Sequence, residues 1–257
     1  MKTPPLPTTL AAALLAGLAT LAGGGCKRAE KKPAPGSSAL AALAAPQAAA
    51  TPLRVARTHE TFKLDGELDE PPWNAIAART GAFLDDTGSS ARPYSEARFL
   101  WDADNLYVGL YAADEDIRAT VTEHDGPVWI DDAFALHLSP GPAAGDGGPA
   151  TVYAFDISAT GVVTDARKVA GGKSDVSWES GIKLGVDRDG TVNNPKDFDE
   201  EWVVEAAIPF RSLGIEPRPG ARVLVDIGRC DTPRGSKERR CGAWGTPKAP
   251  RVIELSP

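Results

Sequence analysis

The chain has 257 residues, of which 42% are hydrophobic and 25% charged, and its formal net charge is −7. This acidic balance, with no basic stripe to follow a phosphate backbone, excludes nucleic acid as an expected partner. Three cysteines and a single methionine, Met1, leave few residues for sulfur chemistry.

The first 25 residues predict an export signal. Lys2 precedes an apolar run over residues 10–22, which is followed by small residues. This run is shorter than the roughly 20 residues that a membrane-spanning helix needs, and it has the length of a signal-peptide core.

Cys26 comes directly after those small residues, in an arrangement that resembles the bacterial lipoprotein signal. The match departs at Gly23, where that signal favours leucine. We expect Cys26 to carry a lipid that anchors the protein in the cell envelope, at the outer membrane, on a face that the sequence does not specify. Plain secretion with a free Cys26 is the alternative.

Residues 26–52 are rich in alanine and proline and contain almost no aromatic or β-branched residues. Such a segment cannot bury enough apolar surface to offset its conformational entropy, so we expect a tether. The remaining 257 − 52 = 205 residues, 53–257, are the length of one β-sandwich or barrel domain.

Short alternating runs follow one another through the rest of the chain. Residues 95–102 and 105–114 predict a hairpin, because Ala97, Phe99 and Trp101 alternate before the turn DADN. Two further expected strands, residues 151–158 and 161–169, flank an Ala-Thr-Gly turn. Another pair, 181–186 and 201–209, flanks a longer loop. The last expected strands are 221–230 and 251–255. Short helical turns are expected after Pro72 and after Pro209, the second ending at Gly214.

These elements predict an all-β fold, an antiparallel β-sandwich of jelly-roll or immunoglobulin-like type with one or two short helices. In the run VWIDDAFALHL, Phe134, Leu136 and Leu138 fall on one face of a strand, which we expect to face the core. Core packing is also expected for Trp73, Trp101 and Trp202, and a structural role for Glu205.

Cys230 and Cys241 bracket the polar loop DTPRGSKERR. In an exported protein this spacing predicts a disulfide across a hairpin. A zinc site at this pair would need two more ligands, and none accompanies it.

The sequence carries none of the motifs of common catalytic sites, and we expect no enzymatic activity. His59, His124 and His137 share no ligand-like spacing, so surface or strand positions are expected rather than metal binding. The neighbouring acids Asp131 and Asp132 would point to opposite faces of a strand, unlike the converging carboxylates of a glycosidase.

No cofactor is expected apart from structural calcium. The loop beginning at Asp187 starts like an EF-hand, but it has Val192 and Phe198 where that loop needs glycine and glutamate. A solvated hairpin loop is the simpler interpretation. The alternative is a calcium ion held in another geometry by the four aspartates of this loop, Asp187, Asp189, Asp197 and Asp199.

Six segments in order resemble the family 9 carbohydrate-binding modules of bacterial polysaccharide-degrading systems. They are LDGELDEPPWNAI, FLWDADNLYVGLYAAD, VWIDDAFALHL, YAFDISATGVVTDA, EWVVEAAIPFRSLG and GAWGTPKAPRVIEL. The resemblance covers residues 63–255 and implies a non-catalytic β-sandwich that binds sugar between two tryptophans, in some members with structural calcium.

Within this resemblance, Trp129 and Trp244 match the two sugar-binding tryptophans. An aromatic slot suits a pyranose ring because it buries the C–H groups of the ring faces. Asp132, Asp156 and His137 are the expected hydroxyl partners. The chain departs from the family at Ala135, where a carboxylate is expected, and at Asp156, where an arginine is expected.

The sequence therefore predicts a lipid-anchored, carbohydrate-binding envelope protein. The alternative is an envelope structural or protein-interaction module that keeps this fold and has lost sugar binding. Haem binding by a related sandwich is disfavoured, because Met1 lies in the signal and leaves no methionine as an axial ligand.

Overall fold

The computed structural model describes residues 51–141, 151–244 and 250–257. The predicted signal, Cys26 and nearly all of the tether lie outside the described residues. Among the helices of the described part, none is long and apolar enough to cross a membrane.

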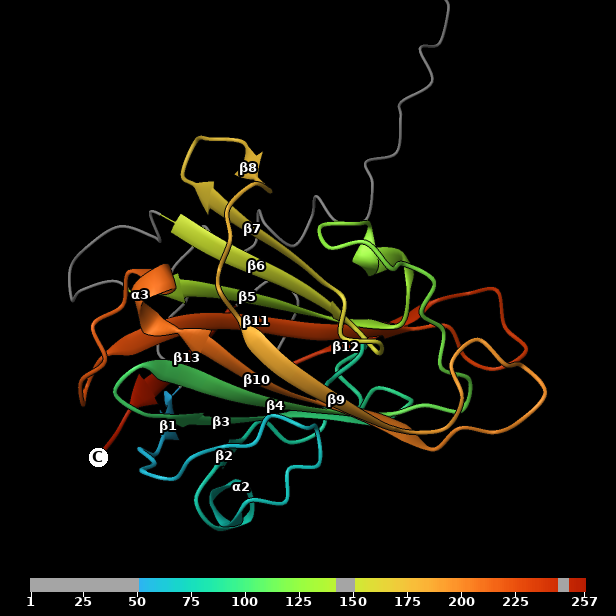
Figure 1. The fold of residues 1–257 in the computed structure, drawn as a ribbon, viewed down its shortest axis with the longest axis horizontal. Helices are drawn as coiled ribbons and strands as arrows, with labels where there is room; N and C mark the ends of the chain where they lie inside the picture. The colour runs from blue at the N-terminus through green and yellow to red at the C-terminus, as the bar shows by residue number, and fades with distance from the viewer. Residues whose placement is uncertain (1–50, 142–150, 245–249) are drawn as a thin grey trace, which may run out of the picture. The chain divides into compact units, whose positions relative to one another are not determined.

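Two sheets form the two layers of a β-sandwich (Figure 1). The larger sheet has eight strands, with β12 paired to β11 beside the strand order β1-β13-β11-β5-β6-β7-β8. Its strands are β1 (Leu53–Val55), β5 (Ala133–Pro140), β6 (Thr151–Ser158), β7 (Val163–Val169), β8 (Ser174–Asp175), β11 (Arg222–Asp231), β12 (Arg240–Ala243) and β13 (Arg251–Leu255).

The smaller sheet has five strands in the order β2-β3-β4-β10-β9. They are β2 (Ala78–Arg79), β3 (Ser95–Trp101), β4 (Asn105–Ala113), β9 (Lys183–Asp189) and β10 (Glu201–Pro209). The predicted hairpin of β3 and β4 forms across the turn at residues 102–104, with Trp101 opposite Leu106.

The predicted all-β sandwich is confirmed. The strand pairs are antiparallel with one exception, since β1 runs parallel to β13. The sequence did not predict this pair. Strand β1 has only three residues, too few to show alternation, and it pairs with the last strand of the chain.

The main core lies between the two sheets and contains the residues that alternation assigned to it. Phe134, Leu136 and Leu138 of β5 are fully buried, as are Phe99 and Trp202 on the opposing sheet. The Phe134 and Trp202 rings meet edge to face, with centroids 5.0 Å apart. Burial of each such side chain contributes about 2–3 kcal/mol to folding.

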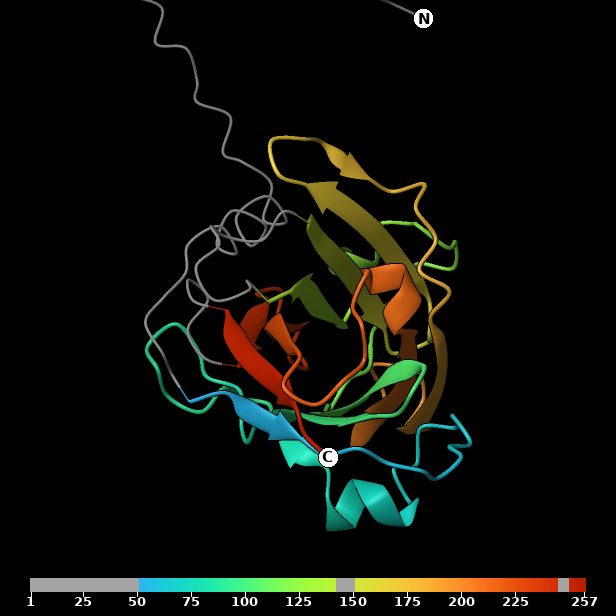
Figure 2. The ribbon, with the colours of Figure 1, turned by 90° about the vertical axis from the view of Figure 1, so that its left-hand side faces the viewer.

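Two short helices occupy the positions expected for them. Helix α2 (Pro71–Ala75) has proline in its first turn, and α3 (Phe210–Leu213) ends at Gly214. Gly214 has φ 61°, in the left-handed region where glycine bears no Cβ penalty. Helix α2 lies outside the five-stranded sheet (Figure 2).

A second, smaller core covers the outer face of that sheet. Its buried members are Leu68, Trp73, Leu100, Tyr107, Val203 and Ala207. The segment before α2 approaches β9 so closely that a Cβ on Gly185 would lie 2.1 Å from the carbonyl oxygen of Leu64. Glycine is therefore required at position 185.

Glu205 of β10 binds the backbone of the segment before α2, and this contact confirms its predicted structural role. The side chain is fully buried, and one carboxylate oxygen, Oε2, accepts hydrogen bonds of 3.0 Å from the backbone N–H groups of Asp65 and Gly66. Burial raises the pKa of Glu205 to about 7, and the neighbouring carboxyl of Glu70 acts in the same direction.

The predicted disulfide is also confirmed. Cys230 of β11 lies directly opposite Cys241 of β12, and the two sulfurs are bonded. The bond closes the loop of residues 231–240 and contributes about 3 kcal/mol by loop entropy.

We predict that Glu205→Gln flattens the pH dependence of stability. A carboxyl group whose pKa is raised on folding stabilises the fold fully below its unfolded pKa, and this stabilisation is lost as pH rises through about 7. Glutamine mimics the protonated acid, because its oxygen accepts both backbone N–H groups. The variant should match the wild type in urea unfolding at pH 5 and exceed it at pH 8.

Glu216→Gln is the matched control, because the side chain of Glu216 is 83% exposed. It should leave the difference between pH 5 and pH 8 unchanged. A Glu205→Gln variant that loses stability equally at both pH values would show that Glu205 is ionised in the folded protein.

Candidate functional site

Trp129 is presented on a short 3-10 helix, η2 (Val128–Ile130), that leads into β5. Val128 is fully buried and anchors this turn, whereas Trp129 is 47% exposed and Ile130 is 56% exposed. The Trp129 ring stacks on no other aromatic ring of the described residues. An exposed tryptophan on an anchored turn is a platform available to a ligand.

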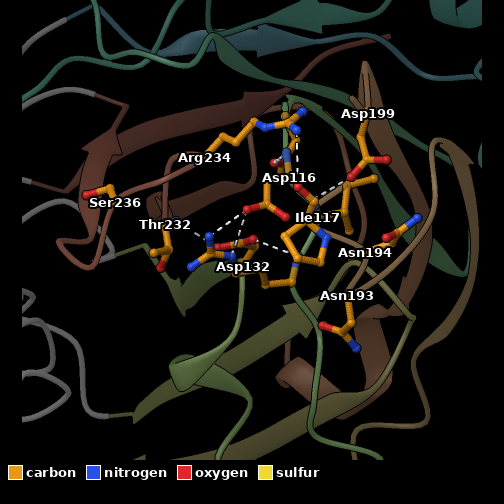
Figure 3. Close-up of polar contacts among 12 residues, drawn as sticks. Asp116, Ile117, Asp132, Asn193, Asn194, Asp199, Thr232, Arg234 and Ser236 are labelled. Carbon is orange, nitrogen blue, oxygen red and sulfur yellow. Dashed lines mark hydrogen bonds and ion pairs between the residues drawn. The ribbon is translucent and has the colours of Figure 1, made fainter. Parts of the chain in front are cut away.

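The two aspartates after this turn hold the neighbouring loop in place. Asp131 accepts hydrogen bonds of 2.7 Å from the backbone N–H groups of Thr120 and Val121. Asp132 accepts bonds from the backbone N–H groups of Arg118, at 2.8 Å, and Thr232, at 2.9 Å (Figure 3). Both carboxylates therefore act within the fold.

The placement of Asp132 does not suit the contact with sugar expected from the sequence. Its side chain is fully buried, so it reaches no surface on which a ligand could lie. It faces inward because it belongs to the loop junction that precedes β5.

Arg239 fixes the same turn from the other side. Its guanidinium donates to the backbone carbonyl of Trp129 and, at 2.6 Å, to that of Asp131. Burial lowers the pKa of Arg239, while the surrounding carboxylates, Asp156 among them, act against that shift. The loop closed by the disulfide thus places the guanidinium of Arg239 against the turn that carries Trp129.

The outer face of the eight-stranded sheet continues from this turn. In β5, Ala135 lies opposite Gly228 of β11 and Asp156 of β6. Two residues further, His137 lies opposite Asp226 and Ala154. Small residues therefore form a low floor, with the side chains of Asp156, His137 and Asp226 beside it.

These polar groups lie close to one another. The Nδ1 atom of His137 lies 3.5 Å from a carboxylate oxygen of Asp226. Burial raises the pKa of Asp156, whereas the nearby His137 and Arg239 act to lower it. Arg239 is bonded to the backbone of Trp129 and interacts with Asp156, which in turn interacts with His137. We call these four residues the outer-face cluster.

Trp244 has a different environment. Its backbone N–H donates to Ile227 of β11, and its half-buried ring lies against the core, 6.2 Å from the ring of Phe99. A slot with Trp129 and Trp244 as its two walls stays a prediction, since Trp129 is presented from η2 at the start of β5 and Trp244 packs beside the inner residue Phe99.

A buried acidic cluster lies at the end of the sandwich near Asp132. Carboxylate oxygens of Asp114, Asp132 and Asp231 lie within 4.8 Å of one another, and all three side chains are buried. Arg229 partly neutralises them, at 2.7 Å from Asp114 and 2.8 Å from Asp231. Within the described part of the chain, Oδ2 of Asp231 is buried without a hydrogen-bond partner.

Burial also changes the protonation of this cluster. It raises the pKa of Asp132 to about 7, and the charges of Asp114 and Asp231 act in the same direction. Burial raises the pKa of Asp231 to about 6 although Arg229 opposes the change. Burial and mutual repulsion therefore favour the protonated forms of Asp132 and Asp231 more than water does.

The four loop aspartates proposed for calcium are not gathered in this way. Asp187 and Asp189 are exposed on β9, whereas Asp199 is buried and accepts the backbone N–H groups of Ile117 and Thr191 at 2.7 Å (Figure 3). Among the residues that the structure describes, the groups of acids and histidines able to hold an ion lie elsewhere.

Sequence reasoning missed Arg239 and Asp226. Asp226 falls on the polar side of an alternating strand, so period-2 alternation was a usable signal. Arg239 gave none, because it belongs to a polar loop and reaches a carbonyl 110 residues earlier in the chain.

The comparisons with known proteins agree with this architecture. Residues 64–249 match the family model described as "Carbohydrate family 9 binding domain-like". No curated protein matches the chain. A crystal structure of a putative carbohydrate-binding protein from Bacteroides uniformis is 14% identical, with a TM-score of 0.59, over 79% of this chain and 98% of the other.

Two further structures are of a family 9 carbohydrate-binding module from Caldicellulosiruptor kristjanssonii. One is in complex with cellotriose, at 13% identity and TM-score 0.49, and covers 79% of this chain and 93% of the other. The second is in complex with glucose, at 12% identity and TM-score 0.48, with 79% and 95% covered. On the match over residues 64–249, the chain belongs to the family 9 carbohydrate-binding domain-like proteins.

Proposed function

We propose that this protein binds carbohydrate without catalysis, on the outer face of its eight-stranded sheet. The observation that carries the proposal is the exposed ring of Trp129, on a turn whose backbone carbonyl is bonded by Arg239, together with the interaction of Arg239 with Asp156 on the outer face. A pyranose ring offers C–H groups that pack on an aromatic face and hydroxyl groups that need donors and acceptors beside it. The family membership supports the same function.

Each member of the outer-face cluster has a separate role in this proposal. Trp129 supplies the apolar platform, and Asp156 accepts hydrogen bonds from sugar hydroxyls. Arg239 donates, which provides the positive group that the family resemblance placed on β6. His137 is only 8% exposed, so its proposed role is to position Asp156 beside it. Trp244 is proposed as the second wall of the site.

The proposal includes export and lipid attachment at Cys26, with residues 26–52 as the tether. This part rests on the sequence of the signal. A tether of this composition would let the domain search for glycan at a distance from the membrane.

Calcium, which the family resemblance implies in some members, suits the buried acidic cluster. Ca²⁺ prefers oxygen ligands, and carboxylates of Asp114, Asp132 and Asp231 converge there. The unpartnered Oδ2 of Asp231 is an oxygen that such a cation would satisfy. When bound, the ion would supply positive charge that stabilises the loop junction behind Trp129.

The sugar-binding prediction is tested by titrating the full chain, in mild detergent, with glucose, cellotriose and a panel of other oligosaccharides in a calorimeter. Trp129→Ala should weaken binding at least about tenfold, which corresponds to ~1.4 kcal/mol. Trp244→Ala should weaken it as well if Trp244 is the second wall, and should leave it intact if the ring only packs on Phe99.

Phe198→Ala is the matched control, because Phe198 is 72% exposed and belongs to the loop before β10. It should bind as the wild type does. Affinity that is indifferent to Trp129→Ala would rule out the outer-face cluster as the site. A chain that binds no glycan would favour the protein-interaction module.

The calcium prediction is tested by thermal unfolding in EDTA and in excess Ca²⁺. A cation at about 100 times its Kd stabilises the folded state by ~2.7 kcal/mol, so the midpoint should rise by several degrees. Asp231→Asn keeps an acceptor for Arg229 and removes one buried charge. It should abolish the response to Ca²⁺ and be at least as stable as the wild type in EDTA.

The exposed Asp187→Asn is the control and should keep the full response. A response to Ca²⁺ that is lost in Asp187→Asn and retained in Asp231→Asn would place the ion in the loop before β10 instead.

A further inference from the structure

A second group of ionisable side chains lies at a different place, where the loop before η2 meets β7. Ligand atoms of His124, Asp125 and Asp165 lie within 4.8 Å of one another. Nε2 of His124 is also 3.2 Å from a carboxylate oxygen of Glu179 and 3.7 Å from one of Asp125. One imidazole and three carboxylates therefore converge from three separate segments of the chain.

Asp165 forms the buried base of this group. It lies on β7 and is 1% exposed. Its Oδ2 accepts a hydrogen bond of 2.9 Å from the backbone N–H of Ser180. Its Oδ1 is buried with no hydrogen-bond partner among the described residues. Leaving a buried carboxylate oxygen without a partner destabilises the fold, so this oxygen points to a ligand that satisfies it.

The loop that carries His124 and Asp125 is fastened to β7. The backbone N–H of Asp125 donates to the carbonyl of Val163 at 3.0 Å, and the hydroxyl of Thr164 donates to the carbonyl of Gly126. Asp125 adopts φ 59°, a conformation that costs free energy in a residue with a Cβ. This backbone places the Asp125 carboxylate beside the imidazole.

Glu179 is held between two anchored neighbours. The ring of Trp178 packs 5.0 Å from that of Tyr153, and Ser180 donates to Asp165. Glu179 itself is exposed, so the site opens to solvent on the side of Glu179 and His124. The combination of a buried base and an open side gives an ion a path of entry.

We propose that His124, Asp125, Asp165 and Glu179 form a binding site for a divalent transition-metal cation of the zinc type. Imidazole nitrogen together with carboxylate oxygen is a ligand set that Zn²⁺ accepts, whereas Ca²⁺ and Mg²⁺ prefer oxygen alone. The site is distinct from the oxygen-only cluster around Asp132, and it does not depend on carbohydrate binding.

The consequence of an ion here follows from the chain order. Asp125 is three residues before the first residue of η2, the turn that presents Trp129. Zinc would cross-link this loop to β7 and to the segment of Trp178, and would rigidify the approach to the turn. Because three carboxylates surround His124, the site concentrates negative charge at the imidazole even before an ion binds.

The test is calorimetric titration of the full chain, untagged and freed of metal with EDTA, with ZnCl₂ in a buffer that does not bind zinc. We expect one site that accepts Zn²⁺ in the presence of excess Ca²⁺. His124→Ala should weaken zinc binding by more than tenfold. Glu179→Gln should weaken it to a smaller degree. His59→Ala, which removes an exposed histidine elsewhere, should bind zinc as the wild type does.

Cobalt provides a second readout, because Co²⁺ in a nitrogen–oxygen site gives visible absorption bands that report its ligands. These bands should appear with one equivalent of Co²⁺ and should change or vanish in His124→Ala. The His124 side chain is 50% exposed, so this variant should keep the fold, which far-ultraviolet circular dichroism checks. Absence of zinc binding, or binding unchanged in His124→Ala, would overturn the proposal.

Discussion

The structure depends on one buried cation, the guanidinium of Arg229. It extends from the eight-stranded sheet to Asp114, which follows β4 of the five-stranded sheet, and to Asp231 on its own strand, at 2.7 and 2.8 Å. It also donates to the carbonyl of Ala113. A charge buried this deeply is tolerated only when it is paired, so removal of Arg229, or of both carboxylates, would leave an uncompensated ion in the interior. Arg229 thereby joins the two layers at the end of the sandwich where the loops meet.

The loop junction built on this ion pair accounts for the position of Trp129. Asp132 lies against the buried cluster and binds the backbone at Arg118 and Thr232, while Asp131 binds the backbone of Thr120 and Val121. The two aspartates therefore accept hydrogen bonds from neighbouring loops, and the two residues before them, Trp129 and Ile130, are exposed. Arg239, positioned by the disulfide-closed loop, completes the turn from the solvent side. The exposed indole thus stands on a turn whose backbone is held by several hydrogen bonds, which is the arrangement that a binding platform requires.

Period-2 alternation was sufficient to predict most of the strands and the inner face of β5, because a strand with one buried face needs an apolar residue at every second position. It could not reveal the parallel pair of β1 and β13, since three residues carry no period. The family resemblance offered Asp132 as a hydroxyl partner, whereas its side chain is buried in the structure. Irregular backbone before a strand lacks the alternation that says which of two adjacent aspartates faces inward. The histidines were weighed by their spacing along the chain, and His124 meets its partners Asp165 and Glu179 only after β7 and the following loop have folded back. Sites assembled from distant loops leave no local pattern.

The central claim is that sugar binds on the outer face at Trp129, and the indole N–H resonances of the six tryptophans test it directly in a ¹⁵N-labelled sample. Titration with an oligosaccharide should shift the Trp129 resonance progressively and to saturation. The signals of Trp73, Trp101 and Trp202, all within the cores, should remain in place. A bound sugar that leaves the Trp129 resonance unmoved and shifts other indoles instead would contradict the account.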